Sequence, residues 1–238
     1  MLIALIGYGK MGKAIEEIAL QRGHSIVLKI DIDNAHDFTK ENLGKADVAI
    51  EFTGPHSAYE NVKKLMEFGV SSICGSTGWL EKLDLIQQIC KQNDGAFVYA
   101  SNFSVGVNIF FEVNKRLAAL MAAHNDYQVH LTEIHHTQKK DAPSGTAITL
   151  AEQILENIPG KKSWVNKKSN SPEELEIISE RIDPAPGTHS VKYSSAIDDI
   201  ELIHTAHTRT GFALGAVLAA EFISGKKGIY TMKDVLGL

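Results

Sequence analysis

The feature that most constrains this chain is a glycine-rich loop directly after its first apolar segment. Residues 2–6 are continuously apolar, and Gly7-Tyr8-Gly9-Lys10-Met11-Gly12 follows them. A continuous apolar run is typical of a parallel strand that is buried on both faces. In a Gly-x-Gly-x-x-Gly loop the first glycine permits a tight turn, the second lets the backbone approach a pyrophosphate, and the third lets helix and strand pack closely. The loop therefore predicts a dinucleotide-binding site.

The residues after the loop complete this pattern. Apolar side chains at positions 14, 15, 18 and 19 have helical spacing, and the N-terminus of such a helix attracts phosphate through its N–H groups and its dipole. Residues 25–30 are predicted to form the next strand, which ends at Asp31. An acid at this place can accept hydrogen bonds from a ribose diol. The alternative is a plain glycine turn in another kind of α/β domain.

Strands and helices then alternate along the chain. We predict strands at 46–52, 71–74 and 96–100 and helices at 57–68 and 81–91, a pattern typical of a doubly wound parallel sheet. Ligands bind beyond the carboxyl ends of such strands. Two further loops fall there, Gly75-Ser76-Thr77-Gly78 and Ala100-Ser101-Asn102-Phe103. Their N–H groups, hydroxyls and amide suit a ribose and a nicotinamide carboxamide; ordinary strand-to-helix turns are the alternative.

A change of pattern marks a second domain. A long helix is predicted at 105–123, and residues 127–134 alternate polar and apolar, which indicates a half-buried strand of a one-sided, antiparallel sheet. Further predicted elements are a helix at 147–155, a solvated loop at 161–174, strands at 177–182, 188–194 and 199–207, and a helix at 213–224. Residues 229–236 are expected to return to the first domain. The prediction is thus an α/β protein with a dinucleotide-binding domain (1–104 plus 209–238) and a second, α+β domain (105–208).

Residues 133–147 collect most of the chemistry-bearing side chains. Glu133, His135, His136, Lys139 and Asp141 precede Ser144-Gly145-Thr146, which begins an apolar helix. Either Asp141 or Ser144 could cap that helix, and the N–H groups of Gly145 and Thr146 would then suit a carboxylate. A histidine that donates a proton and a lysine that supplies charge fit a small carboxylate substrate undergoing reduction.

A metal site is the alternative for these histidines, because His204 and His207 also lie near a predicted strand end and His130 is close in sequence. The spacings typical of zinc sites are absent, and we predict no metal. Two adjacent residues of a strand point to opposite faces, so only one of His135 and His136 can face a given ligand.

Composition excludes several other classes. The net charge of −5 gives no basic footprint for nucleic acid, and no apolar run approaches the length of a membrane span. The two cysteines, Cys74 and Cys90, do not form a CxxC pair, and no secretory signal is recognised. We therefore expect reduced thiols and a cytoplasmic protein that binds neither nucleic acid nor membrane.

The sequence resembles the 4-hydroxy-tetrahydrodipicolinate reductase (dihydrodipicolinate reductase) family. The most specific match is Glu133-x-His135-His136-x-x-Lys139-x-Asp141-Ala142-Pro143-Ser144-Gly145-Thr146-Ala147. Other blocks follow in the family's order: Gly7 to Gly12, Glu51-Phe52-Thr53, Gly75 to Gly78, residues 101–108, and Arg209-x-x-Phe212-Ala213-x-Gly215-Ala216. The resemblance covers nearly the whole chain. Asp183 departs from it, since a glycine is expected there.

The resemblance implies NAD(P)H-dependent reduction of dihydrodipicolinate to tetrahydrodipicolinate in diaminopimelate and lysine biosynthesis. By it, His135 exchanges the proton and Lys139 is a second donor, while His136, Lys139, Gly145 and Thr146 bind the substrate's carboxylates. Gly75, Ser76, Thr77 and Ala100 to Phe103 would line the nicotinamide site. The family's fold is a Rossmann-type domain plus a mixed-sheet substrate domain that also builds a homotetramer.

The choice between NADH and NADPH stays open. Asp31, with no arginine after it, favours the unmodified ribose of NADH, whereas Lys10 could reach a 2′-phosphate. Two rival functions are a nucleotide-sensing protein without turnover and another Rossmann oxidoreductase, such as a sugar or aspartate dehydrogenase. The intact His135–Lys139 pair argues against a sensor, which needs no proton donor.

Overall fold

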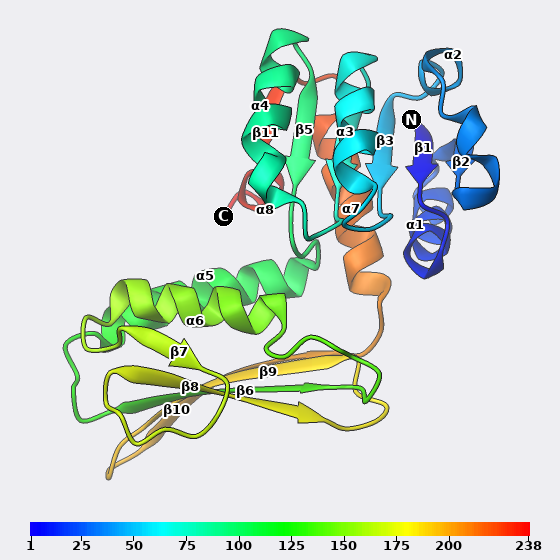
Figure 1. Ribbon diagram of the computed structural model, residues 1–238. Helices are drawn as coiled ribbons and strands as arrows, with labels where there is room; N and C mark the ends of the chain where they lie inside the picture. The colour runs from blue at the N-terminus through cyan, green and yellow to red at the C-terminus, as the bar shows by residue number, and fades with distance from the viewer. The chain divides into compact units, whose positions relative to one another are not determined.

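The computed structural model describes residues 1–238, which form two compact units. Unit 1 comprises Met1–Val105 and Arg209–Leu238, and unit 2 comprises Gly106–Thr208 (Figure 1). The predicted fold class is confirmed, because unit 1 holds a parallel sheet between helices and unit 2 holds a second, mixed sheet. No helix has both the length and the apolar character that crossing a bilayer requires.

The sheet of unit 1 has six parallel strands in the order β11-β5-β4-β3-β1-β2. Their bounds are β1 (Leu2–Ile6), β2 (Ser25–Ile30), β3 (Val48–Glu51), β4 (Ser71–Cys74), β5 (Ala96–Tyr99) and β11 (Gly228–Tyr230). The predicted return of the C-terminal segment is confirmed, since β11 pairs with β5. The strand order reverses between β1 and β3, and such a switch point is where open α/β sheets bind ligands.

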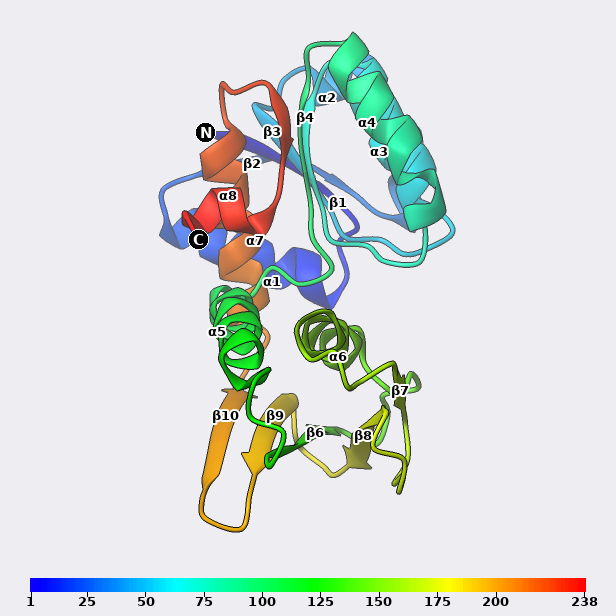
Figure 2. The same ribbon diagram turned by 90° about the vertical axis from the view of Figure 1, so that its left-hand side faces the viewer.

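Helices cover both faces of this sheet (Figure 2). They are α1 (Lys10–Gln21), α2 (Lys40–Leu43), α3 (Ala58–Glu67), α4 (Leu83–Gln92), α7 (Thr210–Ile223) and α8 (Met232–Leu236), with short 3₁₀ turns at Ile32–Asp37 and Leu80–Lys82. Strand β1 shows why its sequence is continuously apolar. Ile3 and Leu5 enter one core cluster with α1 and α7, whereas Ala4 and Ile6 enter the other with α3.

The sheet of unit 2 has five strands in the order β10-β9-β6-β8-β7. Their bounds are β6 (Gln128–His135), β7 (Ser163–Val165), β8 (Glu174–Arg181), β9 (Gly187–Ser194) and β10 (Asp199–Ala206). Helices α5 (Val105–Met121) and α6 (Gly145–Asn157) cover one face, as Figure 1 shows, and contribute to a single core with Leu131, Ile177 and Val191.

Two expectations drawn from the residue pattern of unit 2 are wrong. The antiparallel sheet expected from alternation is mixed, as the family resemblance implies: β8 is parallel to β6 and to β7, whereas β9 is antiparallel to β6 and to β10. The helix α6 lies between β6 and β8 in sequence and provides the crossover that parallel strands need. The expected loop at 161–174 contains β7, a short edge strand whose polar flanks concealed it.

Candidate active site

The glycine loop of unit 1 lies between β1 and α1, at the switch point of the sheet. Gly7 has φ +93°, and a Cβ there would lie 2.2 Å from the carbonyl oxygen of Phe52. A Cβ at Gly12 would lie 2.3 Å from the carbonyl oxygen of Gly7, so the helix can start this close only with glycine. A Cβ at Gly9 would meet no atom within 4 Å. Two glycines thus fix the turn, and the third faces open space that fits a pyrophosphate.

A cavity of about 360 Å³ opens beside this loop. Its polar lining comes from Asp31, Thr53, Ser57, Asn61 and Lys64. The Asp31 carboxylate accepts a hydrogen bond of 2.9 Å from the N–H of Ile32, and the Asp31 N–H donates to Asn34 at 2.8 Å. These two hydrogen bonds hold Asp31 at the rim of the cavity, and the size of the cavity suits a nucleoside.

The other residues of the loop have separate environments. The Tyr8 hydroxyl donates to Glu16, and the Lys29 ammonium lies 2.6 Å from the Glu16 carboxylate and 4.8 Å from the centre of the Tyr8 ring. Met11 packs against the core, and Lys10 is exposed. Tyr8 is therefore tied to α1 and β2, whereas Lys10 is accessible to a ligand.

The two other predicted loops follow β4 and β5, at the same end of the sheet. Thr77 and Ser101 are exposed, but Ser76 and Phe103 are buried. The Ser76 hydroxyl accepts the N–H of Thr53 at 2.9 Å, and the Phe103 ring packs on Phe52 with centroids 5.7 Å apart. The side chains of Ser76 and Phe103 thus hold the loops together, so only their backbone groups are suited to contact a ligand.

The remaining predicted residues of these loops also have structural constraints. A Cβ at Gly75 would lie 2.2 Å from the Phe52 ring, which leaves no room for a side chain. The Ala100 N–H donates to the carbonyl of Cys74 at 3.3 Å. The Asn102 carboxamide accepts the N–H of Ser104 at 2.9 Å.

In unit 2, strand β6 ends at His135 and helix α6 begins at Gly145. Ser144 is the N-cap, and its hydroxyl accepts the N–H of Ala147 at 3.2 Å. Gly145 and Thr146 form the first turn, where backbone N–H groups lack intrahelical acceptors. No atom lies within 4 Å of a Cβ placed on Gly145. The helix start is therefore open on the side of Gly145 and suited to a carboxylate.

Glu133 is a fully buried carboxylate beneath this helix start. Both of its oxygens lie 3.1 Å from the N–H of Ser144, which donates to them, and the Ser179 hydroxyl donates at 2.7 Å. The Arg181 guanidinium lies 3.4 Å away. Burial raises the pKa of Glu133, but the hydrogen bonds from Ser144 and Ser179 outweigh it and hold the pKa below its ordinary value.

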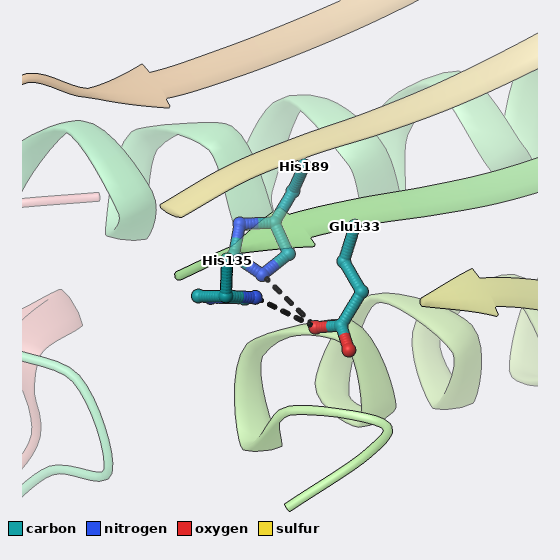
Figure 3. Close-up of side chains that lie close together, drawn as sticks. All are labelled: Glu133, His135 and His189. Atoms are coloured by element: carbon teal, nitrogen blue, oxygen red, sulfur yellow. Dashed lines mark ion pairs between the residues drawn. The ribbon is translucent and has the colours of Figure 1, made fainter. Parts of the chain in front are cut away.

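Two imidazoles face Glu133, as Figure 3 shows. Its Oε2 lies 3.4 Å from Nδ1 of His135 and 3.7 Å from Nε2 of His189, and the two rings are 5.1 Å apart. His189 Nε2 is also 3.1 Å from the Ser144 hydroxyl. Burial lowers the pKa of His135, against the opposing charge of Glu133, and lowers the pKa of His189 to about 3. Both rings are therefore neutral near pH 7 in the ligand-free protein.

The loop between His135 and Ser144 is held by side chains from β8 and the turn after it. Arg181 donates to the carbonyls of Lys139 and Asp141 at 3.4 and 2.7 Å. The Lys139 ammonium lies 2.9 Å from both oxygens of Asp141, and this pairing lowers the pKa of Asp141 although burial raises it. Asp183 accepts the N–H and hydroxyl of Thr137 at 3.1 and 2.6 Å. The residue that departs from the family pattern therefore fixes this loop.

Three atoms, one each from Glu133, His135 and His189, lie within 4.8 Å of one another, which is a spacing that a metal ion could bridge. The Glu133 oxygens already accept hydrogen bonds and face a guanidinium, an arrangement that fits an internal acceptor better than a ligand. Of the other histidines singled out from sequence, His130 faces Glu176 at 3.5 Å. His204 pairs with His189 across β9 and β10, and its ring packs on Phe110.

The structure adds three residues that the sequence did not single out. His189 lies opposite Glu133 on β9, and Ser179 and Arg181 lie beside Glu133 and His135 on β8. The alternation of buried residues along the predicted strand at 188–194 could have indicated His189, since it shares a face with Val191 and Tyr193. Ser179 and Arg181 could be identified only from the parallel register of β6 and β8, which the sequence alone does not give.

Two sequence profiles of one family match the chain. The profile for the N-terminus of dihydrodipicolinate reductase covers residues 1–103, and the profile for its C-terminus covers residues 106–236. A curated relative from Christiangramia forsetii, 4-hydroxy-tetrahydrodipicolinate reductase, is 51% identical over 237 residues, which cover 99% of this chain and 98% of the relative. The reductase of the same name from Methanosarcina mazei is 38% identical over 242 residues, with coverage of 100% and 89%.

Solved structures show the same architecture. Dipicolinate-bound dihydrodipicolinate reductase from Paenisporosarcina sp. TG-14 has a TM-score of 0.77 at 24% identity, and the match covers 98% of each chain. GenD2 from gentamicin A biosynthesis, solved in complex with NAD, has a TM-score of 0.59 at 11% identity and coverage of 99% and 90%. At these identities the likeness establishes the fold.

Proposed function

Since the chain belongs to the dihydrodipicolinate reductase family, we propose that its two units divide one reaction between them. The enzyme is an NAD(P)H-dependent oxidoreductase that converts 4-hydroxy-tetrahydrodipicolinate to tetrahydrodipicolinate in diaminopimelate and lysine biosynthesis. The 4-hydroxyl and a ring hydrogen leave as water, and the resulting dihydrodipicolinate ring takes up one hydride and one proton. Unit 1 is the dinucleotide-binding domain, and unit 2 is the substrate-binding and tetramerisation domain. The observation that carries the proposal is the cluster of Glu133, His135 and the α6 start, which places a proton-transfer group beside a carboxylate site.

In unit 1, the backbone of Gly7 to Gly12 binds the pyrophosphate. The open space at Gly9, where a Cβ would meet no atom within 4 Å, supports this assignment. Asp31 would hold the ribose of the adenosine, and the cavity beside it would take the base. The loops Gly75 to Thr77 and Ala100 to Phe103 hold the nicotinamide through backbone groups and exposed hydroxyls. When bound, the reduced nicotinamide supplies a hydride to the substrate ring.

Cofactor choice depends on the charges around the ribose. The Asp31 carboxylate repels a 2′-phosphate and accepts from a diol, so it favours NADH. Lys64 in the cavity lining and the exposed Lys10 offer compensating positive charge. We therefore infer that NADH is preferred and NADPH is accepted.

In unit 2, the residues complement the two negative charges of a dicarboxylate ring. The N–H groups of Gly145 and Thr146 bind one carboxylate at the α6 start, and His136 and Lys139 complete the site. The neutral His135 of the free enzyme gains a proton when the dianion binds, because nearby negative charge favours the imidazolium. His135 then delivers that proton to the ring atom that gains the electron pair when the ring accepts hydride, and Lys139 is the second donor.

A homotetramer is proposed from the face of the unit 2 sheet that α5 and α6 leave uncovered. Ile203 is 60% exposed on β10, and the alternation along β6 places Ile134 on the same side. Light scattering should give four times the chain mass.

A cytoplasmic location is proposed because Cys74 and Cys90 are both free thiols. Fractionation of cells should place the enzyme with cytosolic markers.

The decisive experiment measures NADH and NADPH oxidation with substrate generated by dihydrodipicolinate synthase. We expect turnover with both nucleotides and a higher kcat/KM with NADH. Nucleotide binding without turnover would instead support a sensor. Turnover with sugars or aspartate, but not with this substrate, would support another Rossmann oxidoreductase.

A further inference from the structure

We propose that Glu133 is a positioning residue that ties the proton donor His135 to the carboxylate site at the start of α6. The inference rests on the proposed function and deepens it, because it assigns a role to a residue that touches neither substrate nor cofactor. Glu133 is fully buried, and its two oxygens are shared among groups from α6, β8 and β9.

The contact with His135 fixes which nitrogen reacts. Nδ1 of His135 is buried, has no hydrogen-bond partner and lies 3.4 Å from Oε2 of Glu133, so the two groups interact through charge. Nε2 lies on the other side of the ring, where a Cβ on Gly187 would come within 3.1 Å of it. A carboxylate on the Nδ1 side stabilises the imidazolium and keeps Nε2 as the exchanging nitrogen, as in other carboxylate–histidine pairs. Gly187 leaves the space that the ring occupies.

The contact with α6 fixes the helix start to the same carboxylate. The N–H of Ser144 donates to both oxygens of Glu133, and the Ser144 hydroxyl in turn caps α6 through Ala147. Ser179 and Arg181 hold the carboxylate from β8. His135 and the first turn of α6 therefore both contact the Glu133 carboxylate. This shared contact keeps the distance between the proton donor and the bound substrate carboxylate constant.

The two roles of Glu133, stabilising the charge of His135 and holding the start of α6, respond differently to Glu133→Gln. A glutamine oxygen can still accept the N–H of Ser144, so substrate binding should survive. The negative charge is lost, while the positive charges of Lys139 and Arg181 still face His135, together with neutral His189 and the anionic Asp141. The imidazolium of His135 is then less stable.

We therefore expect the pKa of His135 to fall by about one unit in Glu133→Gln. Since the protonated fraction above the pKa falls tenfold per unit, kcat near neutral pH should fall by about tenfold, with KM changed by less than about twofold. The pH profile of kcat should move to lower pH by the same unit. The His135 imidazole can be titrated directly by NMR in the full-length protein, with His136 as an internal reference.

A matched control is Glu176→Gln, which removes a carboxylate 3.5 Å from His130 on the same sheet. It should leave the pKa of His135 unchanged. Glu133→Asp retains the charge and should shift the pKa of His135 less than Glu133→Gln does; it also serves if the glutamine variant fails to fold. Circular dichroism and NADH affinity report whether each variant is folded.

An active wild-type enzyme whose Glu133→Gln variant keeps the His135 pKa and the pH profile would overturn the inference. Equal shifts in Glu133→Asp and Glu133→Gln would also overturn it, because charge would then be irrelevant. The NMR titration needs no turnover. If the wild type binds NADH but does not reduce the substrate, the proposed function fails, and the His135 titration still decides whether Glu133 controls the imidazole.

Discussion

The two fully buried carboxylates of this protein, Glu51 in unit 1 and Glu133 in unit 2, accept hydrogen bonds from the same two kinds of donor. Each accepts a backbone N–H at 3.1 Å, from Thr53 for Glu51 and from Ser144 for Glu133. Each also accepts a side-chain hydroxyl, from Thr53 and Ser179 respectively. Both therefore hold a loop at the end of a strand against the body of their unit.

The groups that face the two carboxylates differ. Glu51 faces the thiol of Cys74 at 3.1 Å, and burial together with Glu51 raises the pKa of that thiol well above its usual range. Glu133 faces the imidazole of His135, whose ordinary pKa lies close to neutrality. A buried carboxylate acquires a chemical role when its neighbour can change protonation at working pH. By this criterion Glu51 is structural, whereas the role proposed for Glu133 is to position His135 and stabilise its charge.

The largest expected effect on kcat comes from replacing His135, the group that faces Glu133. His135→Gln should lower kcat by about 100-fold or more, because general acid catalysis contributes at least that much. Cys74→Ala, the corresponding change at Glu51, should keep kcat within about threefold. Steady-state kinetics with NADH binding as a control measures both. Similar losses in the two variants would remove the distinction between the carboxylates.

Acid should destabilise unit 2 through His189. Burial depresses its folded pKa to about 3 from 6.5, so the unfolded chain binds the extra proton first as pH falls. The stability contributed by neutral His189 is present above pH 6.5 and is lost progressively toward pH 3, by about 2 kcal/mol at pH 5. Urea unfolding at pH 7 and pH 5 should show a smaller loss in His189→Asn. An identical loss in the variant would exclude His189 as the cause.

Glu51→Gln tests the structural side of the comparison. The amide keeps an oxygen for Thr53 but gives up the charged acceptor, so the free energy of unfolding should fall by about 1–2 kcal/mol. The pKa of His135 should not move. Denaturant unfolding and the NMR titration measure the two quantities, and a shift of the His135 pKa in this variant would contradict the assignment of Glu51.

Asp31 is a third strand-end carboxylate, but it is exposed and faces a cavity. Asp31→Asn keeps an oxygen for the N–H of Ile32 and removes the charge that repels a 2′-phosphate. The ratio of kcat/KM for NADPH to that for NADH should rise by about tenfold. If the ratio does not change, Asp31 does not set cofactor choice.

The glycine loop could be predicted because the residues that indicate it all lie within the first 31 positions. Gly7 to Gly12, the flanking apolar runs and Asp31 are close in sequence, and backbone groups make the site. The same reasoning did not foresee that Ser76 and Phe103 turn their side chains inward. The packing of Phe52 against Phe103, two residues from separate loops, decides that orientation.

The site in unit 2 was only partly predictable for the opposite reason. His135, Lys139 and the Ser144 cap lie in one stretch, whereas His189, Ser179 and Arg181 reach Glu133 through strand register. Register and strand direction depend on long-range pairing, which alternation along one strand does not specify. For the same reason the parallel direction of β8 and the short edge strand β7 were not predicted.

The position of α7 in the chain has a consequence for biosynthesis. This helix supplies Ala213, Ala216, Val217, Ala219, Ala220 and Ile223 to one of the two core clusters of unit 1. A ribosome makes it only after all of unit 2, so residues 1–105 of unit 1 wait with part of an apolar sheet face uncovered. Unit 2, by contrast, is continuous in sequence and can fold as soon as Thr208 has emerged. Chaperones that recognise nascent apolar surface would therefore engage the N-terminal strands of this protein.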